Sequence, residues 1–183
     1  MTDGATDTTV TSSAAAPPSG GRGRVIVALV VSLVIGYLAD LGTKVLAVSR
    51  LDPLDPPVLF GGLLRLQLIR NPGAAFSMGE SATLLLSLLA ITALVGCAVW
   101  VAPRIRTVWQ GIVLGMAMAG IAGNLTDRLF RAPGPLRGHV VDFLSVPHFA
   151  IFNVADILLT TAAGIVILWS FRDAAAERRA EKA

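Results

Sequence analysis

The sequence predicts an all-α membrane protein with four transmembrane helices and a small extracytoplasmic β-sheet and loop cradle. Three observations lead to this class: 54% of the 183 residues are hydrophobic, only 15% are charged, and the mean hydropathy is +0.71. This balance is far from that of a soluble domain and is typical of membrane proteins. The net charge of +3 does not indicate binding to nucleic acid, because the basic residues flank apolar segments and form no patch.

The chain divides into a tail, a membrane domain and a second short tail. Residues 1–23 are rich in Ser, Thr, Ala, Gly and Pro, so we expect disorder there. We do not expect a cleaved signal peptide, because the apolar run starts only after Arg24 and no convincing cleavage site follows. The membrane domain is expected over residues 24–171, and a charged cytoplasmic tail over residues 172–183.

Four apolar segments are the candidate transmembrane helices. The first has only about fifteen uncharged residues, short of the roughly 20 that span a bilayer, so we expect it to continue as helix to Val48. Asp40 and Lys44 would then share one helix face and form an ion pair. Small residues at Gly111, Gly115 and Ala119 would let the third helix pack closely. The four segments are Val25–Ala39, Ala82–Val101, Val108–Leu125 and Phe149–Trp169.

An even number of spans puts both termini on one side of the membrane. The very short connection Pro103–Thr107 carries two arginines, so the positive-inside rule favours cytoplasmic termini. Two larger pieces lie on the opposite side. The first contains an alternating stretch, Leu64–Arg70, which predicts a strand. The second, Asp127–His148, is rich in Gly, Pro and Arg and is expected to be a loop.

Asp156 is the only charged residue in Phe149–Trp169. A lone carboxylate in a membrane span costs a few kcal/mol and usually has a function. If the helix starts near Phe149, Asp156 lies roughly 10 Å into it. Asp142 precedes the helix and could fold over its end. Two carboxylates in a partly dry site share one proton, which suits an aspartic peptidase. Spacing alone does not choose between Asp142 and Asp127 as the partner.

Four motifs occur in order among the four spans: Asn-Pro-Gly-Ala-Ala-Phe-Ser from Asn71, Gly-Asn-x-x-Asp-Arg from Gly123, Val-Val-Asp-Phe from Val140 and Phe-Asn-x-Ala-Asp from Phe152. Together they resemble the motifs of bacterial lipoprotein signal peptidase, also called signal peptidase II. The resemblance covers about residues 25–169. It implies an intramembrane aspartic endopeptidase that needs no metal or other cofactor and that globomycin inhibits. It would cleave prolipoproteins before a diacylglyceryl-modified cysteine.

The resemblance also assigns roles to individual residues. It makes Asp142 and Asp156 the catalytic pair. Asn71, Gly73, Asn124, Arg128 and Asn153 are expected to bind substrate or to support the site. Asp40, Lys44 and Asp127 are expected to be structural, with Asp127 paired with Arg128 or capping the third helix. Residues 131–138 form a longer connection than is usual in the family.

The resemblance further implies where the enzyme works and what it meets. The expected partners are the prolipoprotein and membrane lipid, without nucleic acid, and the enzyme is expected to be a monomer. Its place would be the bacterial cytoplasmic membrane, with the active site at the outer leaflet. A flap in residues 50–61, or the strand-like edge at residues 64–69, could cover that site.

Two other functions are compatible with parts of the sequence. Lys44 and Ser77 could form a Ser–Lys peptidase pair, although no base is evident beside Ser77. A small transporter or proton-coupled channel could use Asp156 as an ion site. However, a through-path would need polar residues across the bilayer centre, whereas here they gather at one leaflet. Leu94-Val95-Gly96-Cys97 imitates a lipobox in the middle of a span, and we interpret it as a chance match.

Overall fold

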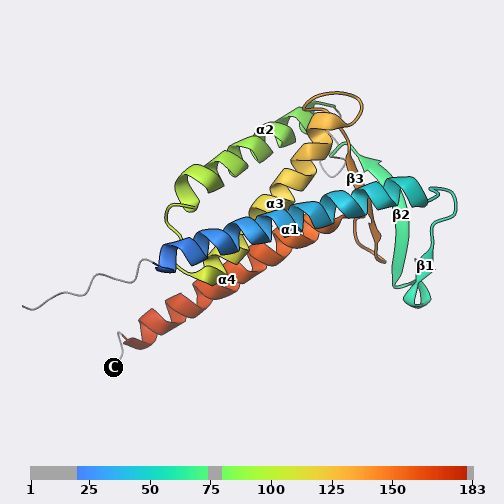
Figure 1. Cartoon of the computed structure of the whole chain (residues 1–183). Coiled ribbons are helices and arrows are strands. Elements are labelled where there is room, and N and C mark those ends of the chain that lie inside the picture. The colour runs from blue at the N-terminus through green and yellow to red at the C-terminus, as the bar shows by residue number, and fades with distance from the viewer. Residues whose placement is uncertain (1–19, 74–79, 181–183) are drawn as a thin grey trace, which may run out of the picture.

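The computed structural model describes residues 20–73 and 80–180, which form a helical bundle with a small sheet at one end (Figure 1). The sheet lies at the opposite end of the bundle from the start of α1 and the end of α4. A 3-10 turn, η1 (Phe60–Gly62), joins the first two strands, and a π-helical turn, η3 (Cys97–Val101), extends α2. The helices are α1 (Gly20–Arg50), α2 (Glu80–Gly96), α3 (Val108–Phe130) and α4 (Val154–Ala180), and the strands are β1 (Val58–Leu59), β2 (Leu64–Asn71) and β3 (Val140–Ser145).

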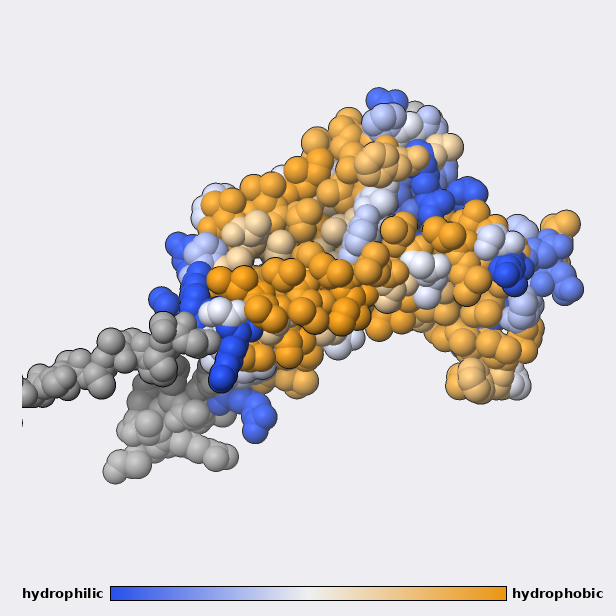
Figure 2. Space-filling view, viewed as in Figure 1, coloured by the Kyte–Doolittle hydropathy of each residue, from blue (hydrophilic) through white to orange (hydrophobic). Residues whose placement is uncertain are grey.

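The four helices are long and apolar enough to cross a membrane, which confirms the predicted fold class. The candidate spans in the described residues are Gly21–Arg50, Thr83–Val101, Val108–Phe130 and Val154–Arg172. Large apolar side chains point outward along them; Ile35 is 63% exposed and Leu168 is 66% exposed. Figure 2 shows this apolar surface across the middle of the bundle, with hydrophilic side chains towards its two ends. Such a surface is stable only in contact with lipid.

Small residues on α3 let it pack directly against two neighbouring helices, as predicted. A Cβ atom on Gly111 would lie 2.6 Å from the Val25 carbonyl oxygen of α1. A Cβ atom on Gly120 would lie 2.5 Å from the Ala155 carbonyl oxygen of α4. Ala119 is fully buried between them. This close packing sets α1 and α4 at fixed positions around α3, and therefore fixes the side chains at their outer ends.

The prediction that the fourth helix starts near Phe149 is wrong, because α4 begins at Val154. Before it, residues 147–149 form a turn and a bend, and Phe152 exchanges backbone hydrogen bonds with Leu144 next to the sheet. Apolar composition alone made this stretch look helical. Asp156 consequently lies in the first turn of α4 rather than about 10 Å into the helix.

The prediction of a loop over Asp127–His148 is also wrong in part. Helix α3 continues to Phe130, and β3 forms within the supposed loop. The strand predicted at Leu64–Arg70 is confirmed as β2. The sheet is antiparallel in the order β1-β2-β3. Its register pairs Ile69 with Asp142 and so brings the end of β2 to the predicted catalytic residue.

The boundaries of the predicted tails differ from those of the helices. Helix α1 already begins at Gly20, inside the segment assigned to the tail, and residues 1–19 lie outside the described residues. At the other end, α4 continues to Ala180, through most of the segment assigned to a charged tail. The hydropathy of the sequence locates the apolar part of α1 and α4, whereas both helices continue into polar residues beyond it.

Candidate active site

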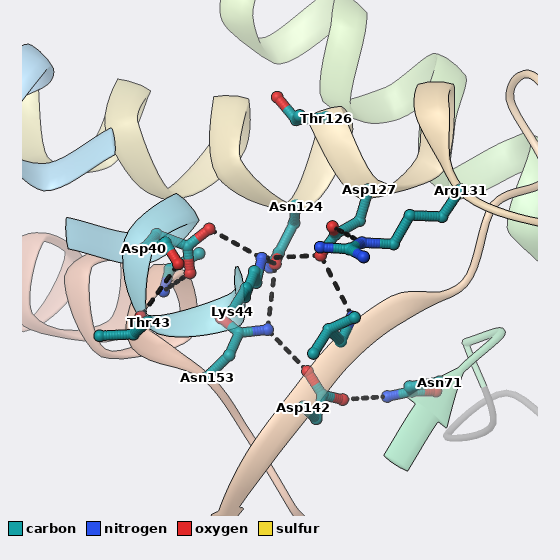
Figure 3. A network of polar contacts seen from close by, with 12 residues as sticks. Asp40, Thr43, Lys44, Asn71, Asn124, Thr126, Asp127, Arg131, Asp142 and Asn153 are labelled. Atoms are coloured by element: carbon teal, nitrogen blue, oxygen red, sulfur yellow. Dashed lines mark hydrogen bonds and ion pairs between the residues drawn. The ribbon is translucent and has the colours of Figure 1, made fainter. Parts of the chain in front are cut away.

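The predicted site residues come together at the end of the bundle that carries the sheet, and Figure 3 shows the polar network around Asp142, Asn153 and Lys44. Strand β3 contributes Asp142, the first turn of α4 contributes Asp156, and the end of β2 contributes Asn71. The connection before α4 supplies Asn153. The last turns of α3 and the outer half of α1 supply the others, which are Asn124, Asp127, Arg128, Asp40 and Lys44.

Asp142 is 2% exposed, and both of its carboxylate oxygens accept amide hydrogen bonds. Asn71 Nδ2 donates to Oδ2 at 2.8 Å, and Asn153 Nδ2 donates to Oδ1 at 2.6 Å. Burial raises the pKa of Asp142 to about 6, although the two amide hydrogen bonds favour the anion and lower it. The negative charge of Asp156 raises the pKa further. Asp142 is therefore able to hold a proton close to neutral pH.

Asp156 accepts two hydrogen bonds and helps to begin α4. Asn124 Nδ2 donates to Oδ1 at 2.9 Å, and the Asn153 backbone N–H donates to Oδ2 at 3.1 Å. In return, the Asp156 backbone N–H donates to Asn153 Oδ1 at 3.1 Å. This reciprocal pair has the form of a capping box. Asn153 therefore caps the N-terminus of α4 and at the same time hydrogen-bonds to both Asp142 and Asp156.

A carboxylate of α1 also accepts a hydrogen bond from the first turn of α4. The Ala155 backbone N–H donates to Asp40 Oδ1 at 2.9 Å. Free N–H groups at a helix start carry partial positive charge and stabilise nearby anions. The start of α4 therefore stabilises the negative charge at this end of the bundle.

Lys44 is the cation at the centre of the network, and its side chain is 1% exposed. Its Nζ lies 2.8 Å from Asp40 Oδ2, which confirms the predicted ion pair, and 3.0 Å from Asp127 Oδ2. Nζ also donates to Asn124 Oδ1 at 2.9 Å. Because an ammonium group can only donate, this contact fixes the oxygen of the Asn124 amide on Lys44. The Asn124 Nδ2 is thereby turned towards Asp156.

The direct contacts of the Asp127 carboxylate differ from the pairing with Arg128 or the helix cap that were expected. Its carboxylate pairs with Lys44 and with Arg131, and Oδ2 accepts the Val141 backbone N–H at 3.1 Å. Arg128 interacts with Asp127 electrostatically, whereas the direct partners of the carboxylate are Lys44, Arg131 and the Val141 N–H, so the side chain ties α3 to α1 and β3 rather than capping α3. Arg131 was not among the candidates, although its spacing of four residues from Asp127 would have indicated the pair. Through Val141, Asp127 holds β3 and so Asp142 against α3.

Arg128 lies half-buried in the same place. Its guanidinium interacts electrostatically with Asp142, Asp127 and Asp156. Among the described residues, its Nη1 is buried without a hydrogen-bond partner. A buried donor without an acceptor is costly, so this atom is suited to an acceptor from outside the chain.

Two buried hydroxyl groups of α2 hold the loops around the site, and no pattern in the sequence indicates this role. Ser87 Oγ donates to the Leu136 carbonyl at 2.7 Å, and Thr83 Oγ1 donates to the Pro72 carbonyl. Ser87 therefore anchors the long connection over residues 131–138. Thr83 anchors the segment in which the Gly73 N–H donates to Asn71 Oδ1 at 2.8 Å.

Gly73 has a φ of 104°, and a Cβ atom on it would lie 2.8 Å from Leu86 Cδ1. The position therefore needs glycine, for its conformation and for its lack of a side chain. Ser77 and the rest of its motif from Ala74 lie outside the described residues. Within the described ranges, no cluster of three or more His, Cys, Asp or Glu side chains is arranged to hold a metal ion.

Comparison with known proteins identifies the family. A family model described as signal peptidase (SPase) II matches residues 31–172. A lipoprotein signal peptidase from Mycobacterium tuberculosis (strain ATCC 25618 / H37Rv) is 44% identical over 158 residues, which are 86% of this chain and 75% of the relative. A protein of the same name from Leifsonia xyli subsp. xyli is 42% identical over 161 residues, covering 87% of this chain and 74% of the relative.

A solved structure supports the same fold. The structure, described as a bacterial membrane enzyme solved by the in meso method at 1.9 Å resolution, matches with a TM-score of 0.72 at 24% identity. The match covers 81% of this chain and 95% of that chain. Together, the family model and the relatives identify this chain as a member of the signal peptidase II family.

Proposed function

We propose that Asp142 and Asp156 are the catalytic pair with which this signal peptidase cleaves prolipoproteins before the diacylglyceryl-modified cysteine. The observation that carries the proposal is the position of Asn153. Its Nδ2 donates to Asp142, its backbone N–H donates to the Asp156 carboxylate, and its Oδ1 accepts the Asp156 backbone N–H. One residue therefore fixes both carboxyl groups relative to each other, which a paired acid–base mechanism requires.

The charges around the pair support one shared proton. Among the described residues of the network, four carboxylates (Asp40, Asp127, Asp142 and Asp156) lie near three cations (Lys44, Arg128 and Arg131). Asp40 and Asp127 are matched by Lys44 and Arg131. Arg128 then balances one of the two remaining negative charges. A single proton on the Asp142–Asp156 pair would balance the other.

In this mechanism the ionised carboxylate takes a proton from a water molecule, whose oxygen attacks the scissile carbonyl carbon. The protonated carboxyl gives its proton to the carbonyl oxygen, and a tetrahedral diol forms. The proton taken from water then passes to the leaving nitrogen as the C–N bond breaks, and one hydroxyl of the diol returns its proton to the other carboxylate, which restores the shared proton of the pair. The products are a free carboxylic acid and an amine on the modified cysteine. The buried Nη1 of Arg128 is suited to donate to the carbonyl oxygen during attack.

The placement of the site supports a substrate that stays partly in the bilayer. The carboxylates lie at the end of four lipid-facing helices, beside the sheet. We assign this end to the outer leaflet of the cytoplasmic membrane and both termini to the cytoplasm, because the short connection at the other end carries Arg104 and Arg106. All the named site residues come from one chain, which supports a monomeric enzyme.

A Ser–Lys mechanism has less support from the contacts of Lys44. A general base must be neutral and must reach its nucleophile. The Lys44 side chain is instead buried between Asp40 and Asp127 and forms an ion pair with each of them. The third contact of Lys44 Nζ is with Asn124 Oδ1, so all three contacts of the ammonium group lie within the site network.

A comparison of two variants in one processing assay tests the proposal. The substrate is a diacylglyceryl-modified prolipoprotein, and the readout is release of the signal peptide by the full chain in lipid–detergent micelles. Asp142→Asn is expected to lose activity by about 10²-fold or more, because acid–base catalysis contributes at least that much. Ser77→Ala is expected to retain substantial activity. Normal cleavage by Asp142→Asn, or complete loss in a folded Ser77→Ala, would overturn the assignment.

A further inference from the structure

A cavity lies between α3 and α4 at the end of the bundle away from the carboxylates. Its volume is about 540 Å³, which is within the range of roughly 300–1,000 Å³ typical of small-molecule sites. It runs along α3 from Ala117, near the middle of that helix, to Trp109 at its start, and along α4 from Leu159 to Trp169. At 1.5 Å per residue, the distance along α3 is about 12 Å. A cavity that extends about 12 Å between mostly apolar side chains is suited to a hydrocarbon chain.

The open end of this cavity carries hydrogen-bond donors. Arg104 and Gln110 line it. Gln110 Oε1 accepts the backbone N–H groups of Arg106 and Thr107 at 2.8 and 3.1 Å, so the remaining polar group of this side chain is the donor Nε2. Arg104 Nη1 donates to the Trp100 carbonyl oxygen, and the guanidinium carries further N–H donors at this end of the cavity. The 23-residue helix α3 also begins here, and its N-terminus favours anions.

Two tryptophans indicate the depth in the membrane at which the Arg104 end of the cavity lies. Trp109 and Trp169 contact each other edge to face, with ring centroids 4.9 Å apart. Tryptophan is enriched at the level of the lipid headgroups. The donors of Arg104 and Gln110 are therefore at the depth of a phosphate group, and the apolar part of the cavity is at the depth of an acyl chain.

We propose that this cavity binds one anionic phospholipid, with an acyl chain between α3 and α4 and the phosphate at Arg104, Gln110 and the start of α3. The signal peptide of the substrate fits less well. The end of a signal peptide that is remote from its cleavage site is positively charged. This end would meet Arg104 and the positive end of α3. Charge complementarity therefore selects the anionic lipid.

Quenching of tryptophan fluorescence by brominated lipid tests the proposal. The chain has three tryptophans, and Trp100→Phe leaves only the two that line the cavity. The full-length variant is placed in phosphatidylcholine bilayers containing increasing fractions of brominated phosphatidylglycerol or brominated phosphatidylcholine. Half-maximal quenching is expected at an about fivefold lower fraction of the anionic lipid. This ratio corresponds to ~1 kcal/mol for one arginine near an anionic headgroup.

Two further changes in the same background separate this site from general attraction to the surface. Arg104→Gln is expected to remove most of the preference. Arg106→Gln, which removes the same charge from the same connection but does not line the cavity, is expected to keep it. Ala163→Phe, which fills the cavity from an exposed position, is expected to lower the quenching by both lipids.

Three results would overturn the proposal. The first is equal quenching by the two lipids in the parent protein. The second is an equal loss of preference in Arg104→Gln and Arg106→Gln. The third is displacement of brominated phosphatidylglycerol by an added synthetic signal peptide, which would assign the cavity to the substrate.

Discussion

Replacing Asn71 by Ala should move the alkaline limb of the pH–activity profile to higher pH. In the proposed mechanism the pair must hold one proton, so activity falls when Asp142 loses it, near pH 6 in the free enzyme. The Asn71 Nδ2 donates to Asp142 at 2.8 Å and favours the anion. Without this donor the anion is less stable, the pKa of Asp142 rises, and the proton is retained to higher pH.

The size of the shift follows from the strength of that hydrogen bond. A hydrogen bond to a charged group contributes about 1.5–3 kcal/mol, and one pKa unit corresponds to 1.36 kcal/mol. Complete loss would therefore raise the pKa by about one to two units. Asn71 is partly exposed, so water can replace some of the lost contact. We expect a shift of about one pH unit.

The assay is kcat/KM for prolipoprotein processing, measured from about pH 5 to pH 9, because kcat/KM reports the ionisation of the free enzyme. Each profile is normalised to its own maximum, so that a general loss of rate does not hide the shift. Gln67→Ala is the matched control, since it removes an amide from the same strand. An unchanged limb in Asn71→Ala, a shift to lower pH, or an equal shift in Gln67→Ala would refute the reasoning.

Two other predictions concern stability. Lys44→Met should destabilise the fold by about 3 kcal/mol or more, because Asp40 and Asp127 stay buried without their shared cation. Thermal unfolding should show this loss of stability and its partial recovery in the double variant Asp40→Asn/Lys44→Met. A loss of stability below about 1 kcal/mol in Lys44→Met would contradict the prediction. The pKa of Asp142 is raised from 3.8 to about 6 by folding, so the folded state loses up to ~3 kcal/mol as pH rises from about 4 to 6. Asp142→Asn should remove this part of the pH dependence, and an equally steep decline in the variant would show that other groups cause it.

The sequence predicted the four helices and β2 because the signals for them are local. Lipid-facing helices are continuous apolar runs, and β2 alternates between apolar and polar residues from Leu64. Strand β3 was missed because both faces of Val140–Phe143 are buried, which removes the alternation. Its existence depends on pairing with β2, a contact between residues far apart in the chain.

The start of α4 was misplaced although a local signal for it was present. Asn153 and Asp156 have the spacing of a capping box, and hydropathy outweighed it because the residues before Asn153 are also apolar. The ion pair of Asp40 and Lys44 was predictable from spacing on one helix. The third partner, Asp127, was not, because it comes from another helix packed against the first through small residues.

The same limit applies to the catalytic pair. Asp156 stood out as the only charge in an apolar segment, whereas the family motifs selected Asp142 over Asp127 as its partner. In the structure these two candidates differ in their partners. Asp127 is neutralised by Lys44 and Arg131, while Asp142 receives only amide donors and shares Asn153 with Asp156. This difference in partners supports Asp142 as the residue with a proton to exchange.

The most direct test of the pair is the rate of signal-peptide release by Asp142→Asn and Asp156→Asn, beside Asp55→Asn as an exposed control. Binding of globomycin to each variant provides the check that the site is folded. We expect both catalytic variants to bind globomycin and to lose about 10²-fold or more in rate, with Asp55→Asn unchanged. A folded Asp156→Asn or Asp142→Asn that releases the signal peptide at the parent rate would contradict the account.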